Sequence, residues 1–234
     1  MSFLVRLWHK VTPLYVSTTE HPIHHDIRID RLALNFYMYK KICLISEFIS
    51  AFEVAISKAG NMETHSSSLL KKSLEALIFE KSLYEKLCDF RFQSTVQLSN
   101  IESLVSYSNF MTVNSIMNSI PVFISAILPY FMVNKEIIEL FICIYANNND
   151  DNINGHDAYS DLIVTKMNKI KSLYSAIMDD ASIVMKNFTE EQPPVVLLKM
   201  EETFLHSVIL NWHFIDEVYT EFKKPAITTV KQVE

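Results

Sequence analysis

The sequence predicts an all-α protein, an up-and-down bundle of roughly five to seven long helices. Two observations predict this fold class. The first is the scarcity of glycine, with only 2 in 234 residues against a usual share of roughly 7%. Tight turns, hairpins and phosphate-binding loops draw on glycine, so its scarcity disfavours β-sandwiches, Rossmann domains and P-loops. The second is that apolar residues recur every three to four positions, while strand-like alternation is not sustained anywhere.

Three apolar stripes carry the helical period. The first is near the start of the chain and consists of Tyr39, Ile42, Ile45, Ile49, Phe52 and Ile56. The second belongs to the last third and consists of Ile163, Met167, Ile170, Tyr174, Ile177, Ala181, Val184 and Phe188. The third follows two prolines and consists of Leu198, Leu205, Val208, Trp212, Ile215, Tyr219 and Phe222. Each stripe is one buried face of a helix at 3.6 residues per turn.

Local signals place the ends of the helices. Pro22 suits a first helical turn, and Gly60 with Asn61 reads as a helix stop. Pro193 and Pro194 interrupt the chain and allow a new helix to begin. We therefore expect helices near 22–59, 67–92, 95–118, 121–146, 158–188 and 194–223. The expected organisation is an N-terminal segment 1–21, one helical bundle domain 22–224 and a flexible tail 225–234.

Composition narrows the function without naming it. The three cysteines, Cys43, Cys88 and Cys143, are far apart and odd in number, so we expect reduced thiols in an intracellular, cytoplasmic protein. No nucleophile-elbow, zinc-protease, dinucleotide or phosphate-loop motif is present. The sequence therefore predicts a protein that is not an enzyme and that has no cofactor, apart from the Ca²⁺ considered below.

An uncharged stretch, 103–134, lies in the middle of the chain. Its most apolar part, 120–133, is shorter than the roughly 20 residues of a membrane span and contains two prolines. It could instead be a central bundle helix, or an exposed patch for self-association. Because apolar surface is in surplus, the sequence favours a non-catalytic helical interaction or scaffold protein that self-associates and binds a macromolecular partner. The residues expected at that interface are Val122, Phe123, Ile127, Tyr130 and Phe131.

A polar loop suggests an alternative, a calcium-responsive module. The spacing over 150–161 resembles that of an EF-hand loop, in which alternate side chains and one backbone carbonyl converge on Ca²⁺. The expected ligands are Asp150, Asn152, Asn154, His156 and Asp161. The loop departs from the pattern because Asp161 replaces the usual glutamate and Asp157 replaces an aliphatic residue. An ordinary solvated loop therefore remains the competing interpretation.

The basic N-terminal third suggests another alternative, a helical RNA-binding protein. Its phosphate-binding side chains would be Arg28, Arg31, Lys40 and Lys41. The net charge of −6 weakens this interpretation. The first residues, FLVRLWHKV, form a short basic amphipathic helix that could rest on a membrane surface, although folding back onto the bundle is favoured.

Histidines give the remaining candidate sites. His21, His24 and His25 precede Asp26, a combination that can bind Zn²⁺, but no further ligand motif accompanies it. His206 and His213 each have a glutamate four residues away on the last helix. The two histidines are seven residues apart, about 10 Å along a helix, so they are expected to form separate surface pairs.

Overall fold

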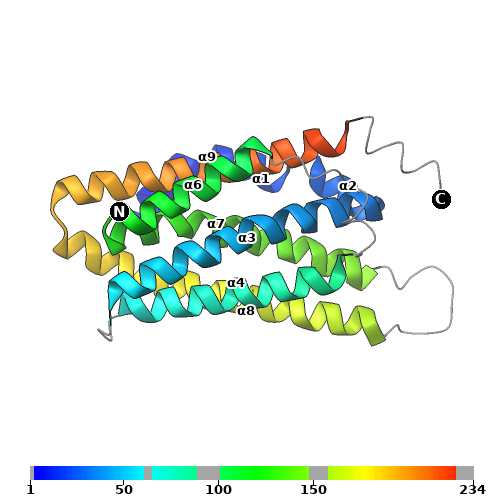
Figure 1. Cartoon of the computed structure of the whole chain (residues 1–234), viewed down its shortest axis with the longest axis horizontal. Coiled ribbons are helices and arrows are strands. Elements are labelled where there is room, and N and C mark those ends of the chain that lie inside the picture. The colour runs from blue at the N-terminus through cyan, green and yellow to red at the C-terminus, as the bar shows by residue number, and fades with distance from the viewer. Residues whose placement is uncertain (1–2, 61–64, 89–100, 148–157, 225–234) are drawn as a thin grey trace.

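The protein is a bundle of long helices, shown by a computed structural model that describes residues 3–60, 65–88, 101–147 and 158–224 (Figure 1). Within these residues the chain forms eight α-helices and no strand, which confirms the predicted fold class. The helices are α1 Phe3–Thr19, α2 Ile23–Ile29, α3 Arg31–Ala59, α4 His65–Leu87, α6 Glu102–Met117, α7 Ile120–Asn147, α8 Ala158–Glu191 and α9 Pro194–Phe222.

The single helix expected over 22–59 is two helices, because the chain breaks at Asp30. The backbone of Asp30 is extended, with φ −128° and ψ 106°. Its carboxylate accepts hydrogen bonds from the N–H groups of Leu32, at 2.9 Å, and Ala33, at 3.4 Å. Aspartate is a favoured helix N-cap. Asp30 is therefore both the C-cap of α2 and the N-cap of α3. The sequence contained this signal, but the apolar period on both sides concealed it.

Helix α7 is the centre of the bundle, and it explains the uncharged stretch. It packs against α8 and α9 most extensively, and also against α6, α1 and α3. All residues from Pro121 to Phe131 are buried. A helix surrounded in this way is apolar on every side. Among the described residues, the structure contains no helix with the length and apolar character needed to cross a membrane.

The predicted stripes match the buried faces unequally. All eight residues of the stripe on α8 are buried. On α3 the observed core face is rotated relative to the predicted one: Tyr39, Ile42 and Ile49 are only partly buried. The fully covered face of α3 instead includes Tyr37, Lys41, Leu44, Phe48 and Phe52. Lys41 therefore lies in the core, where a search for apolar residues could not place it.

Helix α1 lies along α9, so residues 3–19 belong to the bundle (Figure 1). Its apolar face, with Phe3, Leu7 and Val11, is buried. Arg6 and Lys10, on another face, form ion pairs with Glu201 of α9. The apolar face that could have contacted a membrane is therefore covered by the protein itself.

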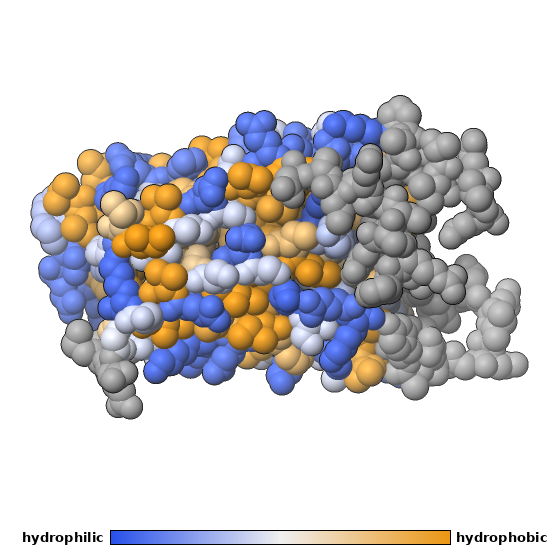
Figure 2. All heavy atoms as spheres, viewed as in Figure 1, coloured by the Kyte–Doolittle hydropathy of each residue, from blue (hydrophilic) through white to orange (hydrophobic). Residues whose placement is uncertain are grey.

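On the outer surface, apolar and polar side chains are interspersed over the face formed by α6, α3 and α4 (Figure 2).

Candidate functional site

The interior contains a group of polar and ionisable side chains, which we call the Glu80 cluster. It consists of Lys41 from α3, Glu80 from α4, Tyr130 and Asn134 from α7, and Tyr174 from α8. Tyr130 and Asn134 are four residues apart and therefore share one face of α7. Glu80 is 0% exposed and Lys41 is 1% exposed. Charged side chains are almost never buried to this degree unless they are paired.

The hydrogen bonds of the cluster converge on one carboxylate oxygen. Tyr130 donates its hydroxyl to Glu80 Oε2 at 2.8 Å, and the Tyr174 hydroxyl donates to the same oxygen. The Lys41 ammonium donates to Tyr130 Oη at 2.9 Å and to Asn134 Oδ1 at 2.6 Å. The Asn134 amide in turn donates to the Tyr130 backbone carbonyl at 2.7 Å, which fixes the orientation of that amide. The buried carboxylate and ammonium are thus connected through one tyrosine hydroxyl.

Two polar atoms of this region have no hydrogen-bond partner. They are Glu80 Oε1, the second carboxylate oxygen, and the hydroxyl of Tyr37 on α3, and both are buried. Most buried polar atoms in proteins are paired, and each unpaired one costs about 1–3 kcal/mol. The cluster therefore retains unused hydrogen-bonding capacity next to a charged group. Such a combination is typical of a site that interacts with something other than the protein.

Burial shifts the ionisation of the cluster. Loss of solvation lowers the pKa of Lys41 from 10.5 to about 8, although the nearby Glu80 charge acts in the opposite direction. Burial, and secondly the Glu80 charge, hold the pKa of Tyr130 and of Tyr174 well above the usual value. The tyrosines are therefore hydrogen-bond donors at neutral pH. Lys41 can gain or lose a proton near physiological pH, which is a property of catalytic lysines.

Aromatic rings surround the cluster. The Phe48 ring lies 5.2 Å from the Tyr130 ring, and the Phe131 ring lies 5.0 Å from the Tyr174 ring, measured between centroids. Phe141 makes an edge contact with Tyr37 at 5.9 Å. Apolar walls with a few convergent polar groups are the usual composition of a small-molecule site. Helix bundles commonly build such sites in their core, from side chains on facing helices.

A second, smaller polar group lies near Phe48, whose ring is also 4.9 Å from the Tyr107 ring. Ser207 of α9 donates its hydroxyl to the Ala126 carbonyl at 2.6 Å. Because a hydroxyl has one proton, Tyr107 must then be the donor to Ser207 Oγ, at 3.1 Å. This group contains no charged side chain, and its hydrogen bonds are made within the protein.

The predicted calcium loop lies mostly outside the described residues. Asp150, Asn152, Asn154 and His156 belong to that part, and Asp161, in the first turn of α8, is exposed. Across the described helices, no three His, Cys, Asp or Glu side chains are grouped so that they could hold a metal ion. The calcium site thus remains a sequence-based prediction.

The predicted RNA-binding lysines are not on the surface. Lys40 is 3% exposed and Lys41 is 1% exposed, so neither ammonium can reach a phosphate backbone. The side chains of Arg28 and Arg31 lie outside the described part of the chain. The RNA-binding alternative is therefore corrected, because two of the four side chains expected to bind phosphate are buried in the core.

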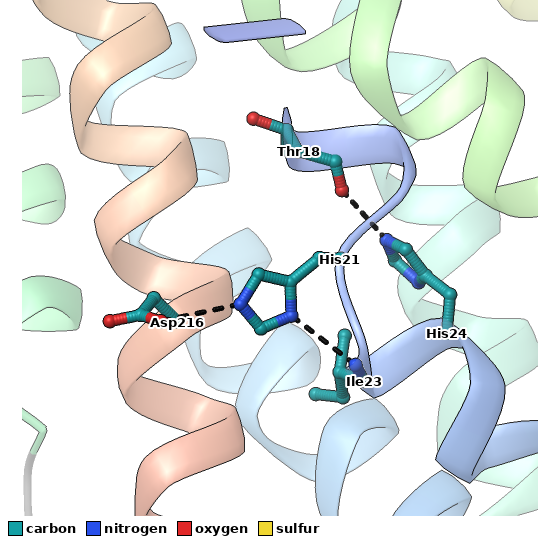
Figure 3. Close-up of polar contacts among 5 residues, drawn as sticks. All are labelled: Thr18, His21, Ile23, His24 and Asp216. Carbon is teal, nitrogen blue, oxygen red and sulfur yellow. Dashed lines mark hydrogen bonds and ion pairs between the residues drawn. The ribbon is translucent and has the colours of Figure 1, made fainter. Parts of the chain in front are cut away.

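The histidines near the start of α2 have separate partners (Figure 3). His21 contacts Asp216 of α9 through Nε2, at 3.3 Å, and accepts the N–H of Ile23 at Nδ1, at 3.2 Å. His24 points the other way and contacts the Thr18 carbonyl at 3.0 Å. The arrangement joins the α1–α2 turn to α9. It does not bring imidazoles together around a point where a metal ion could bind.

The five residues predicted at a self-association interface form part of the core. Their exposed fractions are 3% for Val122, 1% for Ile127 and Tyr130, and 0% for Phe123 and Phe131. They contact neighbouring helices of the same chain, so they cannot meet a second molecule. Tyr130 instead belongs to the Glu80 cluster, a role that the sequence did not indicate.

The surface grooves on the described part of the molecule are weaker candidates for a functional site than the buried Glu80 cluster. One, of about 390 Å³, lies at the α6–α7 turn and the start of α9, lined by Met117, Val195, Leu198 and Glu202, among others. Another, of about 300 Å³, lies between the start of α6 and α9, and includes Asp216 and Glu217. Glu217 is already engaged there, because its carboxylate accepts the N–H groups of Glu102 and Ser103, at 3.0 and 2.6 Å. The interior cluster is therefore the stronger candidate.

Known proteins resemble this chain in structure but not in sequence. No protein-family model matches it, and no curated protein matches its sequence. A TenA homologue from Pyrococcus furiosus superposes with a TM-score of 0.69 at 12% identity, covering 93% of this chain and 100% of the other. A TenA homologue from P. horikoshii OT3 gives 0.62 at 15%, covering 94% and 99%. A TenA family transcription regulator from a Silicibacter species gives 0.65 at 19%, covering 94% and 97%.

These similarities correct the predicted function. The chain has the fold of TenA homologues over nearly its whole length, which contradicts a non-catalytic, self-associating scaffold. The scaffold prediction depended on apolar surface that is in fact the core of this fold. It also depended on the absence of catalytic motifs, but the Glu80 cluster is assembled from four helices and has no contiguous motif to detect.

Proposed function

We propose that this protein is an enzyme that binds a small planar ring compound at the Glu80 cluster and exchanges a proton with it. Glu80 is the acid–base group, and Oε1 is the atom that meets the ligand. The fold shared with TenA homologues supports a function other than a scaffold, and at these identities it does not define the ligand. The chemistry of the side chains indicates the ligand class.

The unpaired Oε1 atom of a fully buried carboxylate carries the proposal. Its other oxygen already accepts two tyrosine hydroxyls, and the Tyr84 hydroxyl also interacts with this carboxylate, so Oε1 is the atom that remains for an incoming N–H donor. The unpaired Tyr37 hydroxyl can donate to a ring nitrogen of the same ligand. A donor and an acceptor on one flat ring correspond to an amino-substituted heteroaromatic compound.

The aromatic surroundings favour a planar ligand. Phe48 and Phe131 contact the tyrosines of the cluster through ring edges, and Phe141 makes the same kind of contact with Tyr37 beside it. Such rings stack on a flat molecule and exclude water, which strengthens a hydrogen bond to a carboxylate. The cluster has almost no exposed surface, so the surrounding helices must separate for a ligand to enter. We therefore expect slow binding, with an association rate constant below roughly 10⁵ M⁻¹ s⁻¹.

Thermal unfolding with matched pairs of small heterocycles tests the proposal. The probes are 4-aminopyrimidine and 2-aminopyridine, each compared with its dimethylamino and unsubstituted analogues. A ligand at 100 times its Kd adds about 2.7 kcal/mol to the free energy of unfolding. For a chain of this size that corresponds to a rise in Tm of roughly 5–10 °C. We expect the amino compounds to raise Tm and the analogues, which lack the N–H donor, to have little effect.

The matched variant is Glu80→Gln. Its single amide oxygen would accept the two tyrosine hydroxyls, which leaves an NH₂ group at the position of Oε1. That group donates and cannot accept an N–H, so the Tm rise must disappear. Tyr107→Phe, which removes a buried hydroxyl that contacts Ser207 and not Glu80, is the control and must retain the Tm rise. Equal shifts for amino and dimethylamino compounds, or an undiminished shift in Glu80→Gln, would refute this assignment.

A further inference from the structure

The hydrogen bonds between Lys41 and Glu80 have a defined direction. An ammonium group can only donate, so Tyr130 Oη is the acceptor in its 2.9 Å contact with Lys41. The single hydroxyl proton of Tyr130 then points to Glu80 Oε2, 2.8 Å away. The donors and acceptors therefore alternate in one direction from the lysine to the carboxylate. Tyr174 also donates to this carboxylate and interacts with the Tyr130 hydroxyl, but among the hydrogen bonds of the described residues none joins Tyr174 directly to Lys41.

We propose that Lys41, Tyr130 and Glu80 form a proton relay in which one proton is shared between the lysine amine and the glutamate carboxylate. In the transfer, an N–H bond of Lys41 breaks as its proton binds Tyr130 Oη. The O–H bond of Tyr130 breaks at the same time, and that proton binds Glu80 Oε2. The ammonium becomes an amine, the carboxylate becomes a carboxylic acid, and Tyr130 ends neutral, as it began.

Burial makes the two forms of this relay comparable in free energy. The ion-pair form gains Coulomb attraction but loses the solvation of two charges, and these opposing contributions are both large in a protein interior. The neutral form has neither the Coulomb attraction nor the loss of solvation, because it contains no charge. The groups that face the relay are neutral tyrosines, Tyr37 from α3, Tyr84 from α4 and Tyr174 from α8, and burial with the Glu80 charge raises the pKa of each. Glu80 is the charged group that acts on Lys41.

The relay gives Lys41 a role in the proposed function. The proton that Glu80 releases to a ligand is the one that Lys41 has supplied through Tyr130, so the release leaves a neutral Lys41 amine and a Glu80 carboxylate. When the ligand returns the proton to Glu80, the reverse transfer through Tyr130 to Lys41 regenerates the ion pair. Lys41 is thus a positioning residue and a proton reservoir, and Glu80 is the group that touches the ligand. The use of the proton rests on the proposed function, whereas the relay itself is a property of the unliganded chain and can be tested without any ligand.

Site-resolved NMR titration of the full chain tests the relay. The two signals are the carboxyl ¹³Cδ of Glu80 and the ¹⁵Nζ of Lys41, followed from pH 6 to 10, a range chosen to include the Lys41 pKa of about 8. Two groups that share one proton titrate with common apparent midpoints. The expected result is a step in the Glu80 signal at the same pH as the step in the Lys41 signal. If the Glu80 signal of the wild-type protein shows no step at that pH, this measurement is sufficient to refute the relay.

Two phenylalanine variants localise the path. Tyr130→Phe removes the hydroxyl that joins the two groups, so the shared step must vanish from the Glu80 signal. Tyr174→Phe removes an equivalent donor to the same carboxylate oxygen but leaves the path intact, so the shared step must remain. A step that survives in Tyr130→Phe contradicts the proposed path. Because no heterocycle is present, these results are independent of the ligand experiment, and each proposal can fail while the other stands.

Discussion

The most informative residues of this protein are charged side chains at core positions. Lys41 and Glu80 each continue the buried face of an otherwise amphipathic helix: Glu80 follows Ser73 and Leu77 on α4, and Lys41 follows Tyr37 on α3. In the sequence, the many Lys and Glu residues of α4 indicate a solvated face, and Glu80 is hidden among them. The signal that could have identified it is positional, because 73, 77, 80 and 84 follow the helical period.

The Lys41 pKa of about 8, below the ordinary 10.5, predicts how stability depends on pH. Below pH 8 both the folded and the unfolded chain bind this proton, and the cost of burying it is fully present. Between pH 8 and 10.5 the unfolded chain binds it more strongly, so the free energy of unfolding rises with pH, by at most about 1.4 kcal/mol per unit. The double variant Lys41→Met/Glu80→Gln has no charge here and should lack this rise. Denaturant unfolding at pH 7, 8, 9 and 10 measures the difference.

The same two residues predict strong energetic coupling. Lys41→Met alone and Glu80→Gln alone each leave one buried charge without its partner, which typically costs about 3–5 kcal/mol. The double variant removes both charges, so it should be destabilised by less than the sum of the single variants, with a coupling energy of roughly 0.5–3 kcal/mol. Urea denaturation of the four proteins gives this value. Additive effects would indicate that the two groups do not interact.

At the scale of elements, apolar contacts rather than ion pairs attach α1 to α9. Leu7 is fully buried, whereas Arg6 and Lys10, the partners of Glu201, are about half exposed. Exposed ion pairs contribute roughly 0–1 kcal/mol. We expect Leu7→Ala to cost about 2–5 kcal/mol and Glu201→Gln to change the free energy of unfolding by less than about 1 kcal/mol. Chemical denaturation of both variants tests this order, and a larger effect of Glu201→Gln would reverse it.

The start of α6 depends on a side chain from another helix. Its N-cap residue, Ile101, has no capping side chain, and the Glu217 carboxylate of α9 accepts the first N–H groups instead. Burial would raise the pKa of Glu217, but hydrogen bonds from Ser103 and Glu102 outweigh it and lower the pKa. The resulting stabilisation is present above the ordinary glutamate pKa of about 4.3 and is lost as the pH falls through the lowered value.

Glu217→Gln should therefore lower the free energy of unfolding at pH 7 by about 0.5–2 kcal/mol, the range for a lost helix cap. The difference between the variant and the wild type should shrink once the pH falls below about 4. Thermal unfolding followed by circular dichroism at pH 7, 5 and 3 provides the comparison. Glu202→Gln, a change at an exposed acidic residue elsewhere on α9, controls for the loss of a charge.

At the scale of the whole molecule, α7 unites the bundle. It contacts α8 and α9 most extensively and also reaches α1, α2, α3 and α6, so it joins helices from both ends of the chain. We expect one cooperative unfolding transition. Trp8 in α1 and Trp212 in α9 provide fluorescence signals that can be compared with far-UV circular dichroism in one denaturant series. Coincident curves agree with a single cooperative unit, and an earlier fluorescence transition would indicate that α1 and α9 separate first.

The sequence by itself determined the class of fold, since scarce glycine and stripes at helical spacing left few alternatives to a helical bundle. It also determined the core face of α8, all of whose predicted residues are buried. The rotation of α3, the break at Asp30 and the Glu80 cluster were decided only by tertiary structure. The physical reason is that periodicity records which side of one helix avoids water, whereas a buried charge is tolerated only if a partner on another helix faces it. Lys41, Glu80 and Tyr130 lie on three helices, and only their packing brings one tyrosine hydroxyl between an amine and a carboxylate.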